Sequence, residues 1–115
     1  MLVVGAGSVA ARKIDALLAS GASIVVVAEK IEPSVQNLAS SNNLEVIQAS
    51  YEKRFLTGSA LVIAATNTAL VNKQVYQDSR ELNILCNVVD KPEYCDFYLP
   101  ATLRRSDLQI AISTN

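Results

Sequence analysis

A short apolar run leads directly into a glycine-containing turn at the start of the chain, and a helical pattern begins just after it. The run is Leu2–Val4, and Gly5, Gly7 and Ala10 give the turn the pattern G-x-G-x-x-A. In this context the pattern predicts a site for the pyrophosphate of a dinucleotide. Gly5 permits the tight turn, Gly7 lets a phosphate approach the backbone, and Ala10 lets the helix pack closely on the strand. The alternative is an ordinary strand–helix turn that happens to hold two glycines.

The rest of the chain alternates between apolar, β-branched runs and helical stripes. This alternation predicts right-handed βαβ units, and hence an α/β fold of the Rossmann type: a doubly wound, mostly parallel sheet with helices on both faces. The strands expected after the first one are residues 23–27, 44–48, 60–65, 84–89 and 108–113. The helices expected between them run from Val9 to Ser20 with Gly21 as C′ residue, from Pro33 onward, and along a stripe of Leu70, Val71, Val75 and Tyr76. Residues 51–58 are expected to be a polar connection with Phe55 and Leu56 under the sheet, and residues 91–98 a loop.

Length and composition exclude several classes of protein. The 115 residues suit one domain, and the net charge is −1 with no basic stripe, so nucleic acid is not an expected partner. No apolar run reaches the length of a membrane span, and no signal peptide is recognisable, which favours a cytoplasmic protein. Because one strand begins at the first residues and another is expected at the end of the chain, we expect a piece of a longer protein.

The two cysteines do not form a metal site with histidine. Cys86 and Cys95 lack the spacing of a zinc site, and the chain contains no histidine, so a His/Cys metal site is excluded. Reduced thiols are expected, as in a cytoplasmic protein, and a single disulfide is the alternative.

Parallel sheets of this kind bind ligands beyond the carboxyl ends of their strands. Four segments that follow predicted strands carry small or polar residues at this edge: 5–9, 28–30, 64–67 and 89–97. The sequence therefore predicts one crevice built from separate parts of the chain. Ala65 and Thr66 have small side chains that let a nicotinamide or its ribose lie close to the backbone. The alternative for them is a tightly packed strand end.

An acidic residue, Glu29, follows the second predicted strand, about twenty residues after the glycine turn. A carboxylate at this place accepts hydrogen bonds from both ribose hydroxyls and repels a 2′-phosphate, which favours NAD over NADP as the cofactor. The neighbouring Lys30 favours the opposite preference, since a cation can receive that phosphate. The alternative is a solvated pair of opposite charges.

Two polar residues mark the fifth predicted strand. Asn87 interrupts an apolar run, so its burial would oblige it to find hydrogen-bond partners, and we consider it as a substrate-binding residue. Asp90 ends the strand at the crevice, where a carboxylate beside apolar walls can act as a general base. The alternative for Asp90 is turn chemistry, because Asp before Lys-Pro is common in turns.

Three blocks of the chain resemble, in the same order, the dehydrogenase domain of the siroheme synthase family. The first is V-V-G-A-G-S-V-A-A-R-K, at residues 3–13. The second is I-A-A-T-N at 63–67, followed by Val71-Asn72. The third combines C-N-V-V-D at 86–90, Asp96-Phe97, Pro100 and A-I-S-T at 111–114. The blocks span essentially the whole chain, and the one departure in the glycine turn is Ala6, where the family has glycine.

The resemblance implies oxidation of precorrin-2 to sirohydrochlorin with NAD⁺, and in many members insertion of Fe²⁺ to give siroheme. It implies that Asp90 accepts the proton and takes part in chelation. It also implies NAD contacts at Ser8, Val9, Glu29 and Lys30. A homodimer is implied for the full-length protein, through a helical region of the family that this sequence does not include. One bifunctional form has a phosphorylated serine that matches Thr114, but the modification is not carried over, and nothing here resembles that form's methyltransferase domain.

Two other interpretations stay open. One is a regulatory nucleotide-binding module, of the type that gates potassium channels, which shares the glycine turn and the acid after the second strand. That interpretation gives no reason for Asn87 and Asp90 at the fifth strand. The other is a piece that binds NAD and catalyses nothing by itself.

Overall fold

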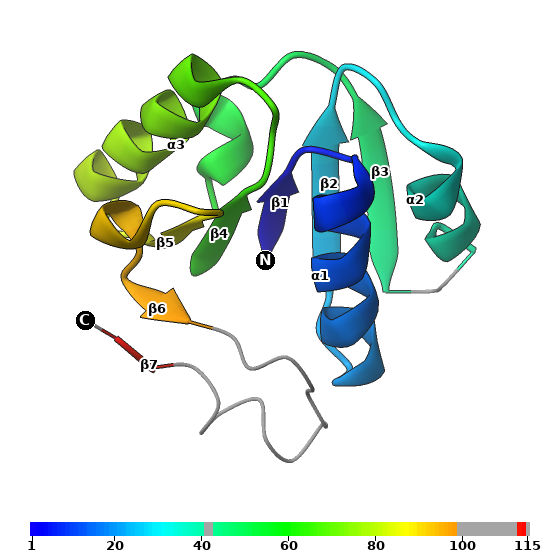
Figure 1. The fold of residues 1–115 in the computed structure, drawn as a ribbon. Coiled ribbons are helices and arrows are strands. Elements are labelled where there is room, and N and C mark those ends of the chain that lie inside the picture. Colours follow the sequence, from blue (N-terminus) through cyan, green and yellow to red (C-terminus); the bar gives the residue numbers. More distant parts are fainter. Residues whose placement is uncertain (41–42, 99–112, 115) are drawn as a thin grey trace.

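Five parallel strands form the central sheet of the computed structural model, which describes residues 1–40, 43–98 and 113–114. The strands are β1 (Leu2–Val4), β2 (Ile24–Ala28), β3 (Leu44–Gln48), β4 (Leu61–Ala64) and β5 (Leu85–Val88). Their order across the sheet is β3-β2-β1-β4-β5, and every neighbouring pair is parallel. The chain thus leaves β1 toward one edge and returns past it to the other, which confirms the predicted Rossmann-type topology (Figure 1).

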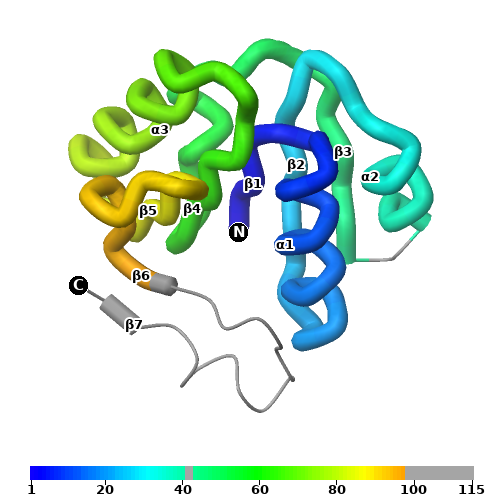
Figure 2. Tube along the Cα trace, viewed as in Figure 1, coloured from blue at the N-terminus to red at the C-terminus, as the bar shows by residue number. Residues whose placement is uncertain are grey.

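Helices cover both faces of the sheet. The helices α1 (Ser8–Ala19) and α2 (Pro33–Leu38) pack on one face, and α3 (Ala69–Glu81) with the short 3₁₀ helix η1 (Lys53–Leu56) packs on the other (Figures 1 and 2). Alternate residues of β1 serve the two layers. Val3 joins the core beneath α1, while Leu2 and Val4 join the core beneath α3. A strand buried on both faces needs a continuous apolar run, and β1 has one.

The ends of the helices follow the predicted signals. Gly21 adopts a φ of 91° just beyond α1, the left-handed conformation expected of a C′ glycine. Pro33 occupies the first turn of α2. Leu56 of η1 is fully buried among residues of the α3 layer and Phe55 packs beside it, as expected for the connection after β3.

The structure corrects the sequence-based expectations at the end of the chain. Residues 91–98, predicted as a loop, contain a second 3₁₀ helix, η2 (Pro92–Tyr94), and a strand, β6 (Phe97–Tyr98). The strand β6 pairs antiparallel with β7 (Ser113–Thr114) in a separate two-stranded sheet. Of the predicted strand at 108–113, only Ser113 lies within the described residues, and it belongs to this small sheet rather than to the central one.

The predicted apolar stripe of α3 is also corrected at one position. Val75 is fully buried and Val71 and Tyr76 pack on the same core, but the side chain of Leu70 is 79% exposed. Leu70 lies in the first turn of α3, above the carboxyl edge of the sheet, where no other element of the described chain covers it.

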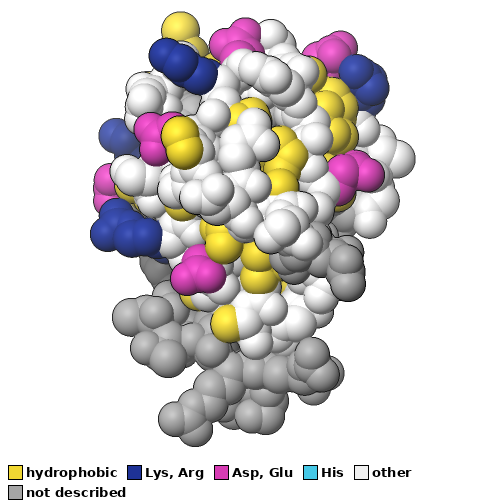
Figure 3. All heavy atoms as spheres, turned by 90° about the vertical axis from the view of Figure 1, so that its right-hand side faces the viewer, with side chains coloured by type: hydrophobic (Ala, Val, Ile, Leu, Met, Phe, Trp, Pro, Cys, Tyr) yellow, Lys and Arg dark blue, Asp and Glu magenta, His cyan; other side chains and the backbone are white. Residues whose placement is uncertain are grey.

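Within the described residues, no helix is long and apolar enough to cross a membrane. On the face shown in Figure 3, acidic and basic side chains are scattered among one another rather than gathered by sign.

Candidate functional site

A cavity of about 710 Å³ opens at the carboxyl edge of the central sheet. All five strands contribute to it through the segments that follow them, and the first turns of α3 close one side. Its lining comprises residues 4–9, 27–30, 32, 49–51, 65–68, 70, 71, 74, 89 and 90. The predicted crevice is therefore present, and it includes a fifth contributing segment, 49–51, that the sequence did not indicate.

Gly5 directly follows β1, and its backbone lies close to that of Ala65, which directly follows β4. Its φ is 118°, and a Cβ on this residue would lie 2.5 Å from the carbonyl oxygen of Ala65. No side chain fits there without moving the backbone of the strand end. Gly5 is therefore required by the fold itself, through the tight turn that the sequence predicted.

Gly7 has a different role. Its φ of −92° is open to any residue, and a Cβ here would meet only the side chain of Glu32, at 3.9 Å. The protein itself thus gives no steric reason for glycine at this position, which lines the cavity. A backbone that must lie against a ligand does give a reason, and the pyrophosphate of a dinucleotide is such a ligand.

The first turn of α1 follows Gly7 and faces the same space. Ser8 and Val9 line the cavity, no side chain caps the helix, and its first turn has no acidic residue. The first N–H groups of a helix have no partner within it and carry the positive end of the helix dipole, so they favour an anion. Ala10 is fully buried beneath this turn, as its small size predicted.

Glu29 and Lys30 follow β2 at the cavity, and both are exposed. The hydroxyl of Ser50 donates a 2.6 Å hydrogen bond to Oε1 of Glu29, and the amide of Gln48 donates to the Glu29 carbonyl oxygen at 3.1 Å. The end of β3 therefore holds both the backbone and the carboxylate of the predicted ribose-binding residue.

The loop after β4 is organised by a residue of α3. Oδ1 of Asn72 accepts hydrogen bonds from the N–H and the hydroxyl of Thr66, at 3.2 and 2.6 Å, and its Nδ2 donates to the Thr66 carbonyl oxygen at 3.1 Å. Ala65 and Thr66 both line the cavity, as predicted. Because Asn72 of α3 fixes the backbone of this loop, the small side chains of Ala65 and Thr66 are held at the cavity.

Tyr51 ties the end of β3 to α3. Its hydroxyl donates a 2.8 Å hydrogen bond to Oδ2 of the buried Asp78, and the amide of Gln74 donates to Oδ1 at 2.9 Å. Burial is the main cause that raises the pKa of Tyr51 above its usual range, and the hydrogen bond to the Asp78 carboxylate adds to it. Tyr51 and Gln74 line the cavity, so this network forms part of its wall.

Asp90 lies on the β5 side of the cavity, beside Val89. It is exposed and adopts a φ of 63°, the left-handed conformation that Asp and Asn tolerate better than most residues. The Asp90 carboxylate therefore belongs to a turn that lines the cavity. This position agrees with both interpretations of the sequence, as a catalytic residue and as a turn residue.

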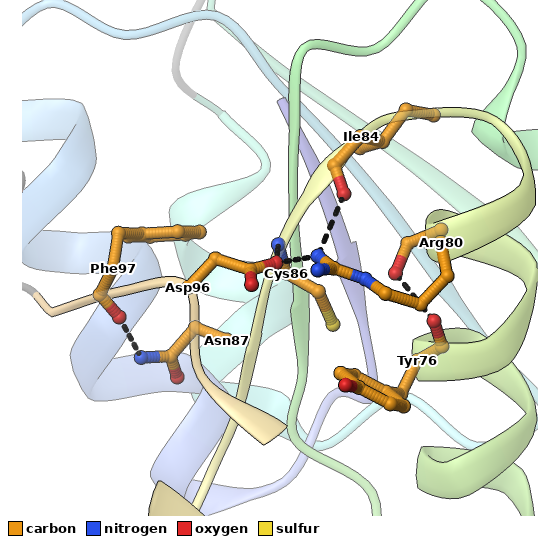
Figure 4. A network of polar contacts seen from close by, with 8 residues as sticks. Tyr76, Arg80, Ile84, Cys86, Asn87, Asp96 and Phe97 are labelled. Atoms are coloured by element: carbon orange, nitrogen blue, oxygen red, sulfur yellow. Dashed lines mark hydrogen bonds and ion pairs between the residues drawn. The ribbon is translucent and has the colours of Figure 1, made fainter. Parts of the chain in front are cut away.

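The residues that follow Asp90 leave the cavity. Of the predicted segment 89–97, only Val89 and Asp90 line it, because the chain turns through η2 and runs back beside β5. Asp96 fixes this return: its backbone N–H donates to the Cys86 carbonyl oxygen, and its Oδ2 accepts from the Cys86 N–H at 2.9 Å. Arg80 of α3 forms an ion pair with the same carboxylate (Figure 4).

Asn87 does not lie in the cavity. It is buried in β5, and its Nδ2 donates a 2.9 Å hydrogen bond to the Phe97 carbonyl oxygen on β6 (Figure 4). Its burial does come with a partner, as expected, but the partner is the backbone of the returning chain.

Reasoning from the sequence missed several cavity residues: Ser50, Tyr51, Leu70, Val71 and Gln74. Ser50 and Tyr51 lie two and three residues after the end of a predicted strand, so the strand-end rule itself could have found them. The α3 residues carried no such signal, since a helical stripe reads equally well as core. Among the described residues, no three Asp, Glu, Cys or His side chains are grouped so that they could hold a metal ion.

A dinucleotide suits this arrangement. The cavity volume falls within the range of small-molecule sites. The open space at Gly7, the uncapped start of α1 and the Glu29 carboxylate offer partners for a pyrophosphate and a ribose.

Comparison with known proteins agrees with this geometry. Residues 1–101 match a protein-family model described as "Putative NAD(P)-binding". The chain belongs to this NAD(P)-binding family. The predicted nicotinamide dinucleotide is thereby confirmed as the class of cofactor.

The chain is also similar to siroheme synthases, as its three sequence blocks predicted. It is 44% identical to a siroheme synthase of Psychrobacter arcticus over 115 residues, which is 100% of this chain and 21% of that protein. It is 45% identical to one of Actinobacillus pleuropneumoniae serotype 3 over 114 residues, 99% of this chain and 24% of that protein. The chain thus spans less than a quarter of the length of these two relatives. A solved structure named "SirC, precorrin-2 dehydrogenase" superposes with a TM-score of 0.69 and 32% identity, covering 76% of this chain and 44% of that one.

Proposed function

We propose that the protein containing this chain oxidises precorrin-2 to sirohydrochlorin with NAD⁺. The observation that carries this proposal is the meeting of the glycine turn, Glu29 and Asp90 around one cavity. The assignment of precorrin-2 as the substrate is supported by two similarities. The chain is similar over its whole length to siroheme synthases, and its fold is similar to that of a precorrin-2 dehydrogenase.

The cofactor would be held by the segments that follow β1, β2 and β4. The backbone at Gly7 and the N–H groups at Ser8 and Val9 would bind the pyrophosphate, and Glu29 would accept hydrogen bonds from the adenosine ribose. Ala65 and Thr66 leave room for the nicotinamide half. When bound, NAD⁺ supplies a hydride acceptor.

Asp90 would act on the substrate. Oxidation of a tetrapyrrole by hydride loss also releases a proton from the ring, and a carboxylate at the cavity can accept it as a general base. Its position in a left-handed turn directs the backbone away after one residue, so that a single carboxylate from this segment remains at the cavity.

The same carboxylate suits the later insertion of Fe²⁺. The tetrapyrrole itself provides nitrogen ligands for the ion, and a base is needed to take the pyrrole protons. We therefore include sirohydrochlorin ferrochelatase activity in the proposal, together with a homodimeric full-length protein that works in the cytoplasm.

The experiment supplies precorrin-2 and NAD⁺ to the full-length protein and to its Asp90→Asn variant, and follows NADH by absorbance. We expect NADH from the unmodified protein and a rate lower by about 10²-fold or more from the variant. No NADH from a protein that still binds NAD⁺ would favour a regulatory nucleotide-binding module. Equal rates of NADH formation from both proteins would show that Asp90 takes no part in the oxidation. Chelation is tested separately, by adding Fe²⁺ to the reaction and recording the absorbance spectrum of siroheme.

A further inference from the structure

We propose that Ser50 is a positioning residue that sets the preference of this site for a ribose with a free 2′-hydroxyl over a 2′-phosphorylated one. It would do so by holding the carboxylate of Glu29. This inference rests on the proposed binding of NAD, and it concerns a residue that carries no recognisable motif.

The contact that supports the proposal joins two strand ends. Ser50 follows β3 and Glu29 follows β2, and these neighbouring strands pair from Ile24–Leu44 to Ala28–Gln48. The last pair of this register lies one residue before Glu29 and two residues before Ser50. The serine hydroxyl donates to Oε1 of Glu29 at 2.6 Å, a short distance typical of a hydrogen bond to a charged acceptor.

Without a hydrogen-bond partner, the Glu29 side chain would not be fixed in one conformation. It is exposed, and a glutamate side chain in water samples many rotamers. The backbone is already fixed, because Gln48 donates to the Glu29 carbonyl oxygen and the Ala49 N–H donates to the Ala28 carbonyl oxygen. Within the part of the chain that the structure describes, the Ser50 hydroxyl is the group that restrains the Glu29 carboxylate itself.

The bond leaves the carboxylate able to bind a ribose. An ionised carboxyl group offers about four acceptor positions, of which the serine uses one. A diol can therefore still donate to it. A 2′-phosphate cannot donate in this way, and its negative charge is repelled by a carboxylate that is held in place.

Lys30 makes this restraint consequential. It lines the same cavity, and in the described residues neither Lys30 nor Glu29 takes part in an ion pair. A carboxylate released from Ser50 could turn away from the ribose and leave the Lys30 ammonium as the charge that a 2′-phosphate meets. Discrimination would then weaken even though both charged residues are still present.

The test measures binding of ADP-ribose and of ADP-ribose 2′-phosphate to the full-length protein by calorimetry. The variants are Ser50→Ala, Ser50→Thr and, as a matched control, Ser34→Ala, which changes an exposed serine of α2 outside the cavity lining. We expect Ser50→Ala to reduce the ratio of the two affinities on the order of three- to tenfold, the effect of a typical hydrogen bond. Ser50→Thr keeps the hydroxyl and should restore the ratio, and Ser34→Ala should not change it.

A structural role alone would not produce this result. Partial loss of folding weakens the binding of both ligands equally and leaves the ratio of their affinities unchanged. An unchanged ratio in Ser50→Ala, beside normal discrimination by the unmodified protein, would overturn the role of Ser50 and leave the NAD assignment intact. An unmodified protein that binds neither ligand, or prefers the 2′-phosphate, would overturn the NAD assignment and this inference with it.

Discussion

The side-chain amide of Asn87 lies 2.9 Å from the carbonyl oxygen of Phe97 and joins β5 to β6. Both residues are buried, and Phe97 is fully so. The bond gives the buried Asn87 amide a hydrogen-bond partner. It also holds β6, which follows Asp90 in the chain, beside β5, which precedes Asp90. The hydrogen bond to β6 thus explains why the polar residue Asn87 lies within the apolar strand β5.

Asn87→Ala should destabilise the fold. The substitution leaves the Phe97 carbonyl oxygen without this donor in a buried place, a loss of about 1–3 kcal/mol in the free energy of unfolding. Urea unfolding measures it, with Asn37→Ala on the exposed surface of α2 as the control. Unchanged stability combined with a lower kcat/KM for precorrin-2 would instead make Asn87 a substrate contact.

The two glycines of the turn should respond differently to alanine. Gly7→Ala replaces a residue with permissive backbone angles and open space, so we expect a loss of about 1 kcal/mol in stability at this helix start and a large loss of NAD⁺ affinity. Gly5→Ala places a Cβ 2.5 Å from the Ala65 carbonyl oxygen at a φ of 118°, and it should prevent stable folding.

Thermal unfolding and NAD⁺ titration of both variants make the comparison. A Gly7→Ala protein that binds NAD⁺ as tightly as the unmodified protein would show that nothing lies against this backbone. The ligand would then have to bind elsewhere in the cavity.

The glycine turn and the parallel sheet could be predicted from the sequence because their signals are local. Gly5, Gly7 and Ala10 stand at fixed spacing between a strand and a helix, and short β-branched runs mark the strands. Glu29 was also found by a spacing rule. Each of these predictions rests on neighbouring residues or on a fixed spacing along the chain, and the fold does not override them.

The remaining features depend on contacts between distant segments. Ser50 matters through Glu29, 21 residues earlier, and Tyr51 through Asp78, 27 residues later. The sequence predicts that the segment after Asp90 belongs to the crevice, but the ion pair between Arg80 and Asp96 fixes its return along β5. No period or motif encodes such pairs, so the sequence alone could not distinguish them from solvated polar residues.

Substitutions at Asp90 should separate catalysis from the backbone turn. At a φ of 63°, asparagine is well tolerated, so Asp90→Asn should keep nearly the full stability while losing activity. Valine is β-branched and should cost about 1–2 kcal/mol in the same conformation. Thermal unfolding of the two variants tests the turn, and an Asp90→Asn protein as unstable as Asp90→Val would contradict the distinction.

Tyr51→Phe should destabilise the wall of the cavity. The change removes the hydroxyl that donates to the buried Asp78, while Gln74 continues to donate to the other carboxylate oxygen. We expect a loss of about 1–3 kcal/mol in the free energy of unfolding. The paired variant Tyr51→Phe with Asp78→Asn completes a double-mutant cycle, and strictly additive effects would show that the two side chains are not coupled.

Stability should fall in alkaline solution through Cys86. Burial raises the pKa of the Cys86 thiol from its ordinary value of 9.0 to about 11 in the folded protein, where the side chain is fully buried. Below pH 9 both states hold the proton and this contribution to stability is complete. Between pH 9 and 11 the unfolded chain loses the proton first, so stability decreases with rising pH, by at most about 1.4 kcal/mol per pH unit for one proton.

Urea unfolding at pH 8 and pH 10 measures this decrease. The unmodified protein should lose about 1 kcal/mol more over this interval than Cys86→Ala, whose lower absolute stability does not enter the difference. The interval ends near pH 10 because the Tyr51 hydroxyl, whose pKa is also raised, contributes in the same direction above it. Equal decreases in the two proteins would mean that the Cys86 thiol titrates alike in the folded and unfolded chains, which its burial in β5 should prevent.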